Sequence, residues 1–429
     1  MKNNNIVRVN KLYLFCLILL FLVLIGRILY LCLVDFKVND STISAFIKSR
    51  NIEEQILYPE RGTIYDKEGN ALAQNVSSYK IIAYLSPERS KNSSTPKHVV
   101  DVDFTANALS PLLNTDVDVL KGYLSKSAYQ VELGVGGKDL SEIQKEEIEK
   151  LKLPGIDFIK STKRYYPNGD FLSYTLGYTV FKNDENNNPW IVGELGIEEY
   201  FNEELTGKTG HISYEKDRYG YKIANGREEK KEAENGNDIH LTIDSNIQLF
   251  VENSLKKAKM DSESEWGVMI VAGAKTGAIL ANSSIPSYNP NEKNMTSYLD
   301  PMVATAYEPG STMKIFSYMC AIEKGNYDGE KTYLSGSKTY TSKNEGDSVT
   351  INDWNKKGWG NITYDEGFAL SSNIAVANLL ENNITKKELL DCYKKYGFGT
   401  NTGFTLKREL NGSVNFKYDV EAAAAGYGQ

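Results

Sequence analysis

An uninterrupted apolar run near the N-terminus constrains this chain more than any other feature. Residues 12–34 are nearly all apolar, with Gly26 and Arg27 the exceptions. A helix of that length would span roughly 34 Å, slightly more than the bilayer hydrocarbon thickness of about 30 Å. Basic residues precede the run at Lys2, Arg8 and Lys11. Cationic flanks stay on the cytoplasmic side, so we expect a cytoplasmic tail at 1–11, a transmembrane anchor at 12–34 and the bulk of the chain outside.

A cleaved signal peptide and a buried core helix are the alternatives for this run. It is long for the apolar region of a signal peptide, and Leu31-Cys32-Leu33 at its distal end is bulky where a cleavage site needs small residues. A continuous apolar run at the extreme N-terminus is also unusual for a core helix. The sequence therefore favours an uncleaved, single-pass anchor.

The composition indicates a globular protein of two or three folded units. The chain has 429 residues, of which 41% are hydrophobic and 24% charged, and its net charge is −7. Acidic and basic residues are interspersed, without the one-sided basic surface that a nucleic-acid-binding protein needs. We therefore exclude nucleic acid as a partner.

Cysteine and histidine add little to the prediction. Cys16 and Cys32 lie within the apolar run, and Cys320 and Cys392 lie in helical, apolar contexts. We expect the latter two to be small core residues, because a disulfide framework is unusual in a domain of this size. The histidines are far apart and lack metal-ligand spacing: His98, His211 and His240. We expect neither a metal site nor a cofactor.

The chain after the anchor divides near residue 238, where a charged, loop-like stretch ends. Before it we expect a helical linker at 37–55, an extended β ribbon over 61–84 and helices within 103–152. After it we expect a helix ending near 259, then a hairpin of strands 266–272 and 278–282, then helices at 311–324, 363–370 and 373–381. This order predicts an α+β fold, a sheet covered by a helical cluster.

The pattern Ser311-x-x-Lys314 places a hydroxyl and an amine on one face of a helix. The tetrapeptide alone recurs elsewhere, but here it follows Glu308-Pro309-Gly310, a turn into an apolar helix. Because that helix is apolar almost all round, we expect it to be buried. Positive potential at its first turn would favour negative charge developing on Ser311.

Lysine can act as a base at this position only if its pKa falls. The ordinary pKa of about 10.4 must drop by roughly three units, or about 4 kcal/mol, for a useful neutral fraction near pH 7. Burial and neighbouring positive potential both lower a lysine pKa. The alternative is that Ser311 caps the helix and Lys314 is solvated.

A second motif, Ser371-Ser372-Asn373, lies 60 residues after Ser311, between two predicted helices. The Ser371 hydroxyl could relay a proton to a leaving amine, and the Asn373 amide could bind Lys314 or a substrate backbone. Taken alone, the motif is as well explained by a helix N-cap.

Together these segments resemble a class B penicillin-binding protein, a monofunctional peptidoglycan transpeptidase. The segments that carry the resemblance come in the family's order: Arg61-Gly-Thr-Ile-Tyr-Asp66, Arg164-Tyr-Tyr-Pro167, Gly193-Glu-Leu-Gly-Ile-Glu198, Lys275-Thr-Gly-Ala-Ile-Leu-Ala281, Tyr307-Glu-Pro-Gly-Ser-Thr-Met-Lys314, Leu370-Ser-Ser-Asn-Ile374, Tyr396-Gly-Phe-Gly399 and Ala425-Gly-Tyr-Gly-Gln429. The resemblance implies an elongated β-rich pedestal (dimerisation-type) domain at 36–238. It also implies a transpeptidase domain with the serine β-lactamase-like fold at 239–429.

One expected element is missing from this pattern. The family's third motif, Lys-Thr/Ser-Gly on a strand, follows the second motif, but no such triplet follows Ser371 here. Lys208-Thr-Gly and Lys275-Thr-Gly both precede Ser311, and we expect both to be turns. The strand would complete the oxyanion hole, and losing one such donor costs roughly 10²- to 10³-fold in rate. We therefore expect the transpeptidase domain to lack its C-terminal part and the chain as given to be poorly active.

The resemblance implies peptidoglycan cross-linking in the bacterial cell membrane. Ser311 and Lys314 would be catalytic, and Ser371 and Asn373 would assist catalysis and bind substrate. The implied ligands are D-Ala–D-Ala stem peptides and β-lactams, and the implied partner is a membrane glycan polymerase. Two alternatives stay open: a β-lactamase or D,D-carboxypeptidase, and a non-catalytic cell-wall scaffold.

Overall fold

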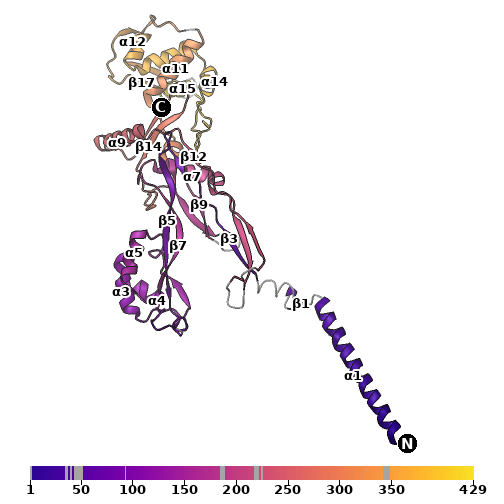
Figure 1. The fold of residues 1–429 in the computed structure, drawn as a ribbon. Coiled ribbons are helices and arrows are strands. Elements are labelled where there is room, and N and C mark those ends of the chain that lie inside the picture. Colours follow the sequence, from indigo (N-terminus) through magenta and orange to yellow (C-terminus); the bar gives the residue numbers. More distant parts are fainter. Residues whose placement is uncertain are drawn as a thin grey trace. The chain divides into compact units, whose positions relative to one another are not determined.

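The computed structural model describes residues 2–33, 37–38, 41–42, 52–91, 93–183, 189–216, 222–223, 226–325, 327–341 and 348–429. The chain forms two compact units. The first combines Met1–Gly62 with Glu203–Asn237, and the second combines Thr63–Asn202 with Asp238–Gln429. Figure 1 labels the elements of both units.

The first unit contains the apolar helix α1 (Lys2–Leu33) and a small sheet. The segment Lys11–Tyr30 of α1 is long and apolar enough to cross a membrane, and none of it is buried. The sheet is antiparallel, and β10 (Gly210–Glu215) lies between β3 (Ile52–Leu57) and β11 (Glu228–Lys231). Helix α8 (Asn202–Thr206) precedes β10.

The helical linker expected at 37–55 is wrong where the structure describes it. Two short strands, β1 (Lys37–Val38) and β2 (Ser41–Thr42), pair with each other, and β3 begins at Ile52. The β3 sequence Ile-Glu-Glu-Gln-Ile-Leu forms backbone hydrogen bonds with β10. A helix of this polar sequence would have no apolar stripe to pack against the rest of the chain, and most helices in proteins depend on such packing for their stability. The remaining residues of the linker lie outside the described part.

A long two-stranded ribbon dominates the first part of the second unit. Strand β5 (Ala71–Tyr84) pairs antiparallel with β7 (Ile156–Tyr165), from Gln74 opposite Tyr165 to Ala83 opposite Ile156 (Figure 1). Strand β6 (Gln130–Glu132) pairs with the end of β5, and β4 (Ile64–Tyr65) with its beginning. The expected ribbon over 61–84 therefore forms, from β4 and β5.

Three helices pack around one apolar core beside this ribbon. They are α3 (Val102–Leu113), α4 (Val117–Leu124) and α5 (Glu142–Lys150). Asp101 caps α3, and Ser141 forms a capping box with Gln144 at α5. The core contains Ile81 from β5 together with residues of the helices and of the chain around them: Leu109, Leu120, Leu133, Leu140 and Ile148. The helices expected within 103–152 are confirmed.

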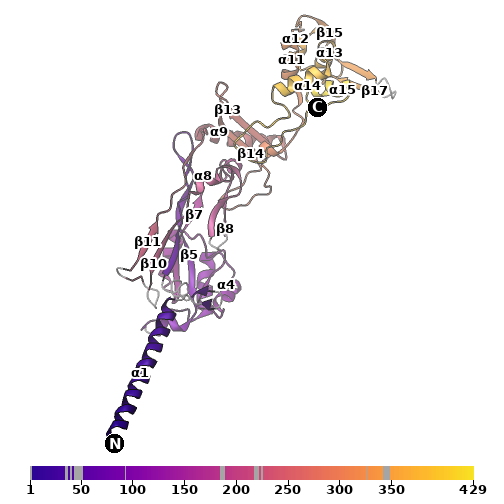
Figure 2. The same ribbon diagram turned by 90° about the vertical axis from the view of Figure 1, so that its right-hand side faces the viewer.

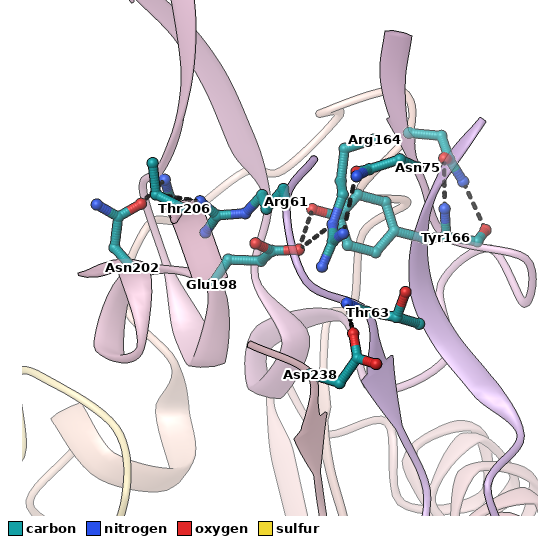
Figure 3. Close-up of polar contacts among 11 residues, drawn as sticks. Arg61, Thr63, Asn75, Arg164, Tyr166, Glu198, Asn202, Thr206 and Asp238 are labelled. Atoms are coloured by element: carbon teal, nitrogen blue, oxygen red, sulfur yellow. Dashed lines mark hydrogen bonds and ion pairs between the residues drawn. The ribbon is translucent and has the colours of Figure 1, made fainter. Parts of the chain in front are cut away.

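A buried ion pair ties the ribbon to the next segment. Helix α6 (Ser173–Leu176), strands β8 (Thr179–Asn183) and β9 (Pro189–Gly193) and helix α7 (Gly196–Tyr200) follow β7. Arg164 Nε lies 2.6 Å from Glu198 Oε1, and their side chains are 2% and 0% exposed. Arg164 also donates to Asn75 and the Tyr166 hydroxyl donates to Glu198 (Figure 3). The motif residues of β7 and α7 are thus structural here.

A polar junction links β4 to the start of helix α9 (Ser245–Ser262). Asp66 accepts hydrogen bonds from the Asn70 backbone at 2.8 Å and from the Ser245 hydroxyl at 2.5 Å. Burial alone would raise the pKa of Asp66, but these bonds lower it to about 2. Lys67 pairs with Asp244, the N-cap of α9, at 2.6 Å. Strand β12 (Ile239–His240) runs parallel to β4, where Thr63 N also donates to Asp238 at 2.7 Å (Figure 3).

The predicted hairpin and helices of the last part of the chain are confirmed. Strands β13 (Gly267–Ala272) and β14 (Ile279–Ile285) pair antiparallel, and α9 packs on them. The helices that follow are α10 (Pro301–Ala304), α11 (Met313–Glu323), α12 (Tyr364–Ala369), α13 (Asn373–Asn383), α14 (Lys386–Lys395) and α15 (Asp419–Gly426). Short strands lie between α11 and α12: β15 (Thr332–Leu334), β16 (Ser337–Thr341), β17 (Ser348–Asn352) and β18 (Asn361–Thr363).

Helices α11, α13, α14 and α15 form the main core of this part (Figure 2). Small residues let them approach closely: Ala375, Ala377, Ala422 and Ala423 are at most 5% exposed. Tyr393 of α14 is fully buried, and its hydroxyl lies 2.7 Å from Ser317 Oγ of α11. Helix α11 is therefore packed against three others.

The prediction that Cys320 and Cys392 are unbridged core residues is wrong. They form a disulfide between α11 and α14, with their Cα atoms 6.1 Å apart. Both helices pack in the same core, so each cysteine is buried or half-buried against the other. Disulfides persist in oxidising compartments, so this bond agrees with the expectation that the bulk of the chain lies outside the membrane.

Candidate active site

The turn before α11 delivers Ser311 to the surface. Gly310–Thr312 form a short 3₁₀ turn, with Gly310 at φ +64°, and α11 begins at Met313. Gly310 N donates to Gly428 O at 3.0 Å. A Cβ at Gly428 would lie 2.0 Å from Gly310 O, and Gly428 itself has φ +89°. Only glycine fits at 428, and its close approach fixes the backbone of the turn that carries Ser311.

Ser311 is exposed on this turn. Among the described residues its hydroxyl makes no hydrogen bond, and Thr312, not Ser311, occupies the N-cap of α11 without a side-chain cap bond. The Thr312 hydroxyl instead donates to Pro309 O at 2.8 Å. The capping alternative for Ser311 is therefore wrong, and its hydroxyl is exposed to solvent.

Lys314 is buried one helical turn after Ser311. Its side chain enters the core side of α11, and the residue is 3% exposed. Its Nζ donates to Ser371 O at 2.5 Å and to Ser371 Oγ at 3.0 Å. Burial lowers the pKa of Lys314 to about 8, against a smaller opposing effect of Asp353. The alternative of a solvated Lys314 is therefore wrong.

The prediction of a fully buried nucleophile helix is wrong for one face. Ile315, Met319 and Ile322 are 50%, 37% and 54% exposed and follow one another at helical spacing. The core of α11 lies on the opposite face, which carries Met313, Ser317 and Ala321. Because α11 carries apolar residues on all its faces, the sequence could not distinguish the packed face from the exposed face.

The loop between α12 and α13 places Ser371 against Lys314. Ser371 has φ +54°, a left-handed conformation that costs a non-glycine residue about 1–2 kcal/mol. Ser371 N donates to Phe368 O at 3.0 Å and Ser372 N to Gly367 O at 2.8 Å. Ser372, not Ser371, caps α13, by accepting from Ala375 N. The N-cap interpretation therefore holds for Ser372 and leaves the Ser371 hydroxyl for Lys314.

Asn373 ends this loop, and among the described residues its amide makes no hydrogen bond to Lys314. It is the first residue of α13, and its Nδ2 donates to Asn352 O at 2.9 Å. The structure thus brings Lys314 and Ser371 into contact and places Ser311 on the turn before Lys314. The Asn373 amide is bonded instead to Asn352, the last residue of β17.

The sequence interpretation missed Asp353, a buried carboxylate behind the loop. It is 1% exposed and accepts hydrogen bonds from Ser372 Oγ at 2.8 Å, Ile374 N at 3.1 Å and Gly336 N at 2.8 Å. Asp353 follows the alternating strand β17 and has no fixed spacing from a nucleophile. No sequence signal distinguishes it from an acidic residue in a surface turn.

The two earlier Lys-Thr-Gly triplets have different structures. Lys275 lies in the turn between β13 and β14, where Gly277 N donates to Gly273 O at 2.8 Å, as expected. Lys208 is not in a turn: it makes an isolated β-bridge with Glu234, and its Nζ lies 2.7 Å from the Glu234 carboxylate.

Two known domain families match most of the chain. The penicillin-binding protein dimerisation domain matches residues 56–241. The penicillin-binding protein transpeptidase domain matches residues 267–429, which include Ser311, Lys314 and the loop of Ser371.

Curated relatives match over nearly the whole chain. Stage V sporulation protein D of Bacillus subtilis (strain 168) is 28% identical over 96% of this chain and 62% of its own length. Peptidoglycan D,D-transpeptidase FtsI of Escherichia coli (strain K12) is 26% identical over 96% of this chain and 66% of its own length. The chain therefore spans less than two thirds of the length of these two relatives.

A solved structure has the same fold. Penicillin Binding Protein 2X from Streptococcus thermophilus is 32% identical, with a TM-score of 0.64 over 88% of this chain and 57% of that chain. A peptidoglycan synthetase from Bifidobacterium adolescentis is 26% identical, with a TM-score of 0.59. The α+β transpeptidase fold with a preceding β-rich domain is therefore confirmed.

Proposed function

Because the chain belongs to the class B penicillin-binding proteins, we propose that the protein cross-links peptidoglycan by acyl transfer through Ser311. Its donor substrate is a stem peptide ending in D-Ala–D-Ala, and β-lactams acylate the same serine. The peptidoglycan D,D-transpeptidases among its relatives support this reaction class.

The reaction proceeds in two displacements. Ser311 Oγ attacks the carbonyl carbon of the penultimate D-alanine and gives its proton to the neutral Lys314 amine. The peptide C–N bond breaks, the proton passes through the Ser371 hydroxyl to the leaving amine, and D-alanine departs. An amine of a neighbouring stem peptide then attacks the serine ester, which forms the cross-link and returns a proton to Ser311.

One observation supports this mechanism above the others: Lys314 is buried and bonded to Ser371, not to a carboxylate. With a pKa of about 8, roughly one lysine in ten is neutral at pH 7, whereas a pKa of 10.5 would leave about one in three thousand. A short lysine–serine contact also gives the proton a path away from the nucleophile.

Ser371 and Asn373 have a second role in the proposal, as substrate-binding groups. Ser371 is held at the base of the site by Lys314, and Asn373 is half-buried at the start of α13. An amide there can donate to a peptide carbonyl after leaving Asn352 O, to which it now donates. The mechanism needs no cofactor.

The remaining domain assignments are part of this proposal. Residues 12–34 anchor the protein in the bacterial cell membrane as a single span, with 1–11 in the cytoplasm and the bulk outside. The apolar helix α1 supports the span, and the basic residues before it support the orientation. Residues 36–238 form the pedestal domain, which docks on a membrane glycan polymerase, and 239–429 belong to the transpeptidase domain.

The reaction is tested with the whole protein, a stem pentapeptide donor and an acceptor amine. D-Alanine release and cross-linked product are measured for the wild type, Ser311→Ala and Lys314→Arg. Both variants should lose both products. Ser311→Ala lacks the proposed nucleophile, and in Lys314→Arg the arginine stays charged and cannot take a proton. Lys331→Arg, an exposed lysine of the same part of the chain, is the matched control and should keep both.

The products also separate the alternatives. D-Alanine release without cross-linked product would indicate a D,D-carboxypeptidase, and rapid hydrolysis of bound β-lactam would indicate a β-lactamase. Full activity of Ser311→Ala would refute the proposed nucleophile. Normal growth of cells that carry only Ser311→Ala would favour a scaffold.

A further inference from the structure

Three consecutive residues, 352–354, bind the loop 370–374 that carries Ser371. Four hydrogen bonds join the two segments: Asn373 Nδ2 to Asn352 O at 2.9 Å, Trp354 Nε1 to Leu370 O at 3.0 Å, and Ser372 Oγ and Ile374 N to Asp353 Oδ1 at 2.8 and 3.1 Å. The conformation of the loop therefore depends on a segment about twenty residues earlier in the chain.

Asp353 is the central residue of this contact. Its other carboxylate oxygen accepts from Gly336 N at 2.8 Å, and Asp353 N donates to Gly336 O at 2.9 Å. A carboxylate that is 1% exposed is costly to bury unless donors satisfy it. Donors from two directions fix its orientation, so Asp353 links the turn before β16 to the start of α13.

The contact compensates for strain at Ser371. A serine with φ +54° persists only where its surroundings hold it. Ser372 and Ile374 are held by Asp353 on one side of Ser371, and Leu370 is held by Trp354 on the other. The carbonyl and hydroxyl of Ser371 both face Lys314 as a result.

Asp353 also acts on Lys314 by its charge. Burial lowers the pKa of Lys314, and Asp353 is the charged group that opposes this among the described residues. Tyr333 lies beside Asp353, and since its pKa is raised to about 12 it is neutral. On the helices packed against α11, Glu381 pairs with Lys338, Glu388 pairs with Lys324 and Glu421 accepts from the backbone of Lys417. The Tyr393 hydroxyl contacts Ser317 of α11 itself.

We propose that Asp353 is a positioning residue for the transfer reaction: it holds Ser371 against Lys314 and stabilises the ammonium form of Lys314 that exists after proton transfer. The proposal rests on the proposed function, because it concerns how Lys314 receives the proton of Ser311. It assigns Asp353 two effects that an experiment can separate, one on geometry and one on charge.

The test measures the acylation rate of the whole protein by a fluorescent penicillin as a function of pH. In Asp353→Asn the plateau rate should fall at least about tenfold, because the amide cannot accept all three hydrogen bonds. The midpoint of the acid limb should move down by about one pH unit, because a lost negative charge disfavours the ammonium form. Ser372→Ala removes the hydrogen bond to Asp353 and the N-cap bond from Ala375 N but no charge, so its plateau should fall at an unchanged midpoint.

Asp365→Asn is the matched charge control. Asp365 is an exposed carboxylate at the start of α12 that accepts from Tyr327, and its neutralisation should change neither plateau nor midpoint. A folded Asp353→Asn variant with an unchanged midpoint would overturn the proposal. If circular dichroism shows that this variant does not fold, Asp353→Glu decides, because it keeps the charge and displaces the carboxylate. A lower plateau at the wild-type midpoint supports the proposal, and an unchanged plateau or a shifted midpoint overturns it.

Failure of the proposed function gives a different result. Labelling that persists in Ser311→Ala would refute the nucleophile whatever Asp353 does. Labelling that is lost in Ser311→Ala, with no midpoint shift in folded Asp353→Asn, would refute only the role of Asp353.

Discussion

Breaking the Cys320–Cys392 disulfide should destabilise the helical cluster that carries Ser311. The bond joins α11 to α14 across a sequence separation of 72 residues. In the chain-entropy treatment, closing a loop of that length restricts the unfolded chain by about 4 kcal/mol, and measured values for disulfides are typically about 2–4 kcal/mol. For a cooperative unit of 150–250 residues this corresponds to a fall in the midpoint of thermal unfolding of roughly 5–15 °C.

The assay is thermal unfolding of the whole protein, with and without a reductant. The reductant should lower the midpoint of the wild type, and Cys320→Ala/Cys392→Ala should unfold near the reduced wild type without responding to the reductant. Cys16→Ala is the matched control, because Cys16 is an exposed free cysteine in α1, and this variant should keep the full response. Thiol titration that finds both Cys320 and Cys392 free in the unreduced protein, or an unchanged midpoint after both are reduced, would refute the reasoning.

Three further predictions concern the base, the nucleophile turn and the buried ion pair. Because Lys314 accepts the proton only when neutral, the acylation rate should rise with pH to a half-maximum near its pKa of about 8, and a half-maximum near 10 would contradict a buried base. Gly428→Ala should slow acylation at least about tenfold, because its Cβ would lie 2.0 Å from a backbone oxygen. Gly397→Ala is the control: Gly397 has φ +90° and a nearest atom at 3.9 Å, so this variant should carry only the left-handed strain of about 1–2 kcal/mol. Equal acylation rates in the two variants would contradict the role of Gly428. Arg164→Met should lower the free energy of unfolding, measured in urea, by about 3–5 kcal/mol, because it removes the cation that pairs with the buried Glu198. Arg408→Met, in an exposed pair, should cost at most about 1 kcal/mol. Similar losses in the two variants would show that burial does not set the cost.

Local patterns in the sequence were sufficient for the parts of the fold that depend on neighbours in the chain. The alternation in 266–272 and 278–282, with a glycine-containing turn between them, predicts the hairpin that β13 and β14 form. Apolar spacing likewise predicts α12 and α13 close to their observed bounds. These elements are specified by periodicities of two and 3.6 residues, which can be read directly from the sequence.

The contact between Lys314 and Ser371 could not be read from local patterns. The spacing of Ser311 and Lys314 places both groups on one side of a helix start, but nothing local brings Ser371 to them. The second motif offered the Ser371 hydroxyl as a proton relay and the Asn373 amide as a contact of Lys314 or of a substrate backbone. In the structure Ser371 Oγ lies 3.0 Å from Lys314 Nζ, whereas the Asn373 amide donates to Asn352 O.

Contacts between distant segments account for what was missed. Asp353 binds a loop about twenty residues away, and Cys320 pairs with Cys392 across 72 residues. Each pairing follows from how helices and short strands pack, which single-residue patterns do not encode. Two cysteines were outside the anchor in a chain expected to face an oxidising compartment, and that count was the available signal for the disulfide.

The central claim is that Ser311 is the residue acylated, with Lys314 as its base. The most direct measurement is mass spectrometry of tryptic peptides after the whole protein has reacted with a penicillin. Cleavage after Lys293 and Lys314 releases Asn294–Lys314, which contains Ser297 and Ser311. The account predicts one adduct, on this peptide and at Ser311, which disappears in Ser311→Ala and is retained in Ser297→Ala. An adduct at any other residue of the wild-type protein, or one that survives Ser311→Ala, would contradict it.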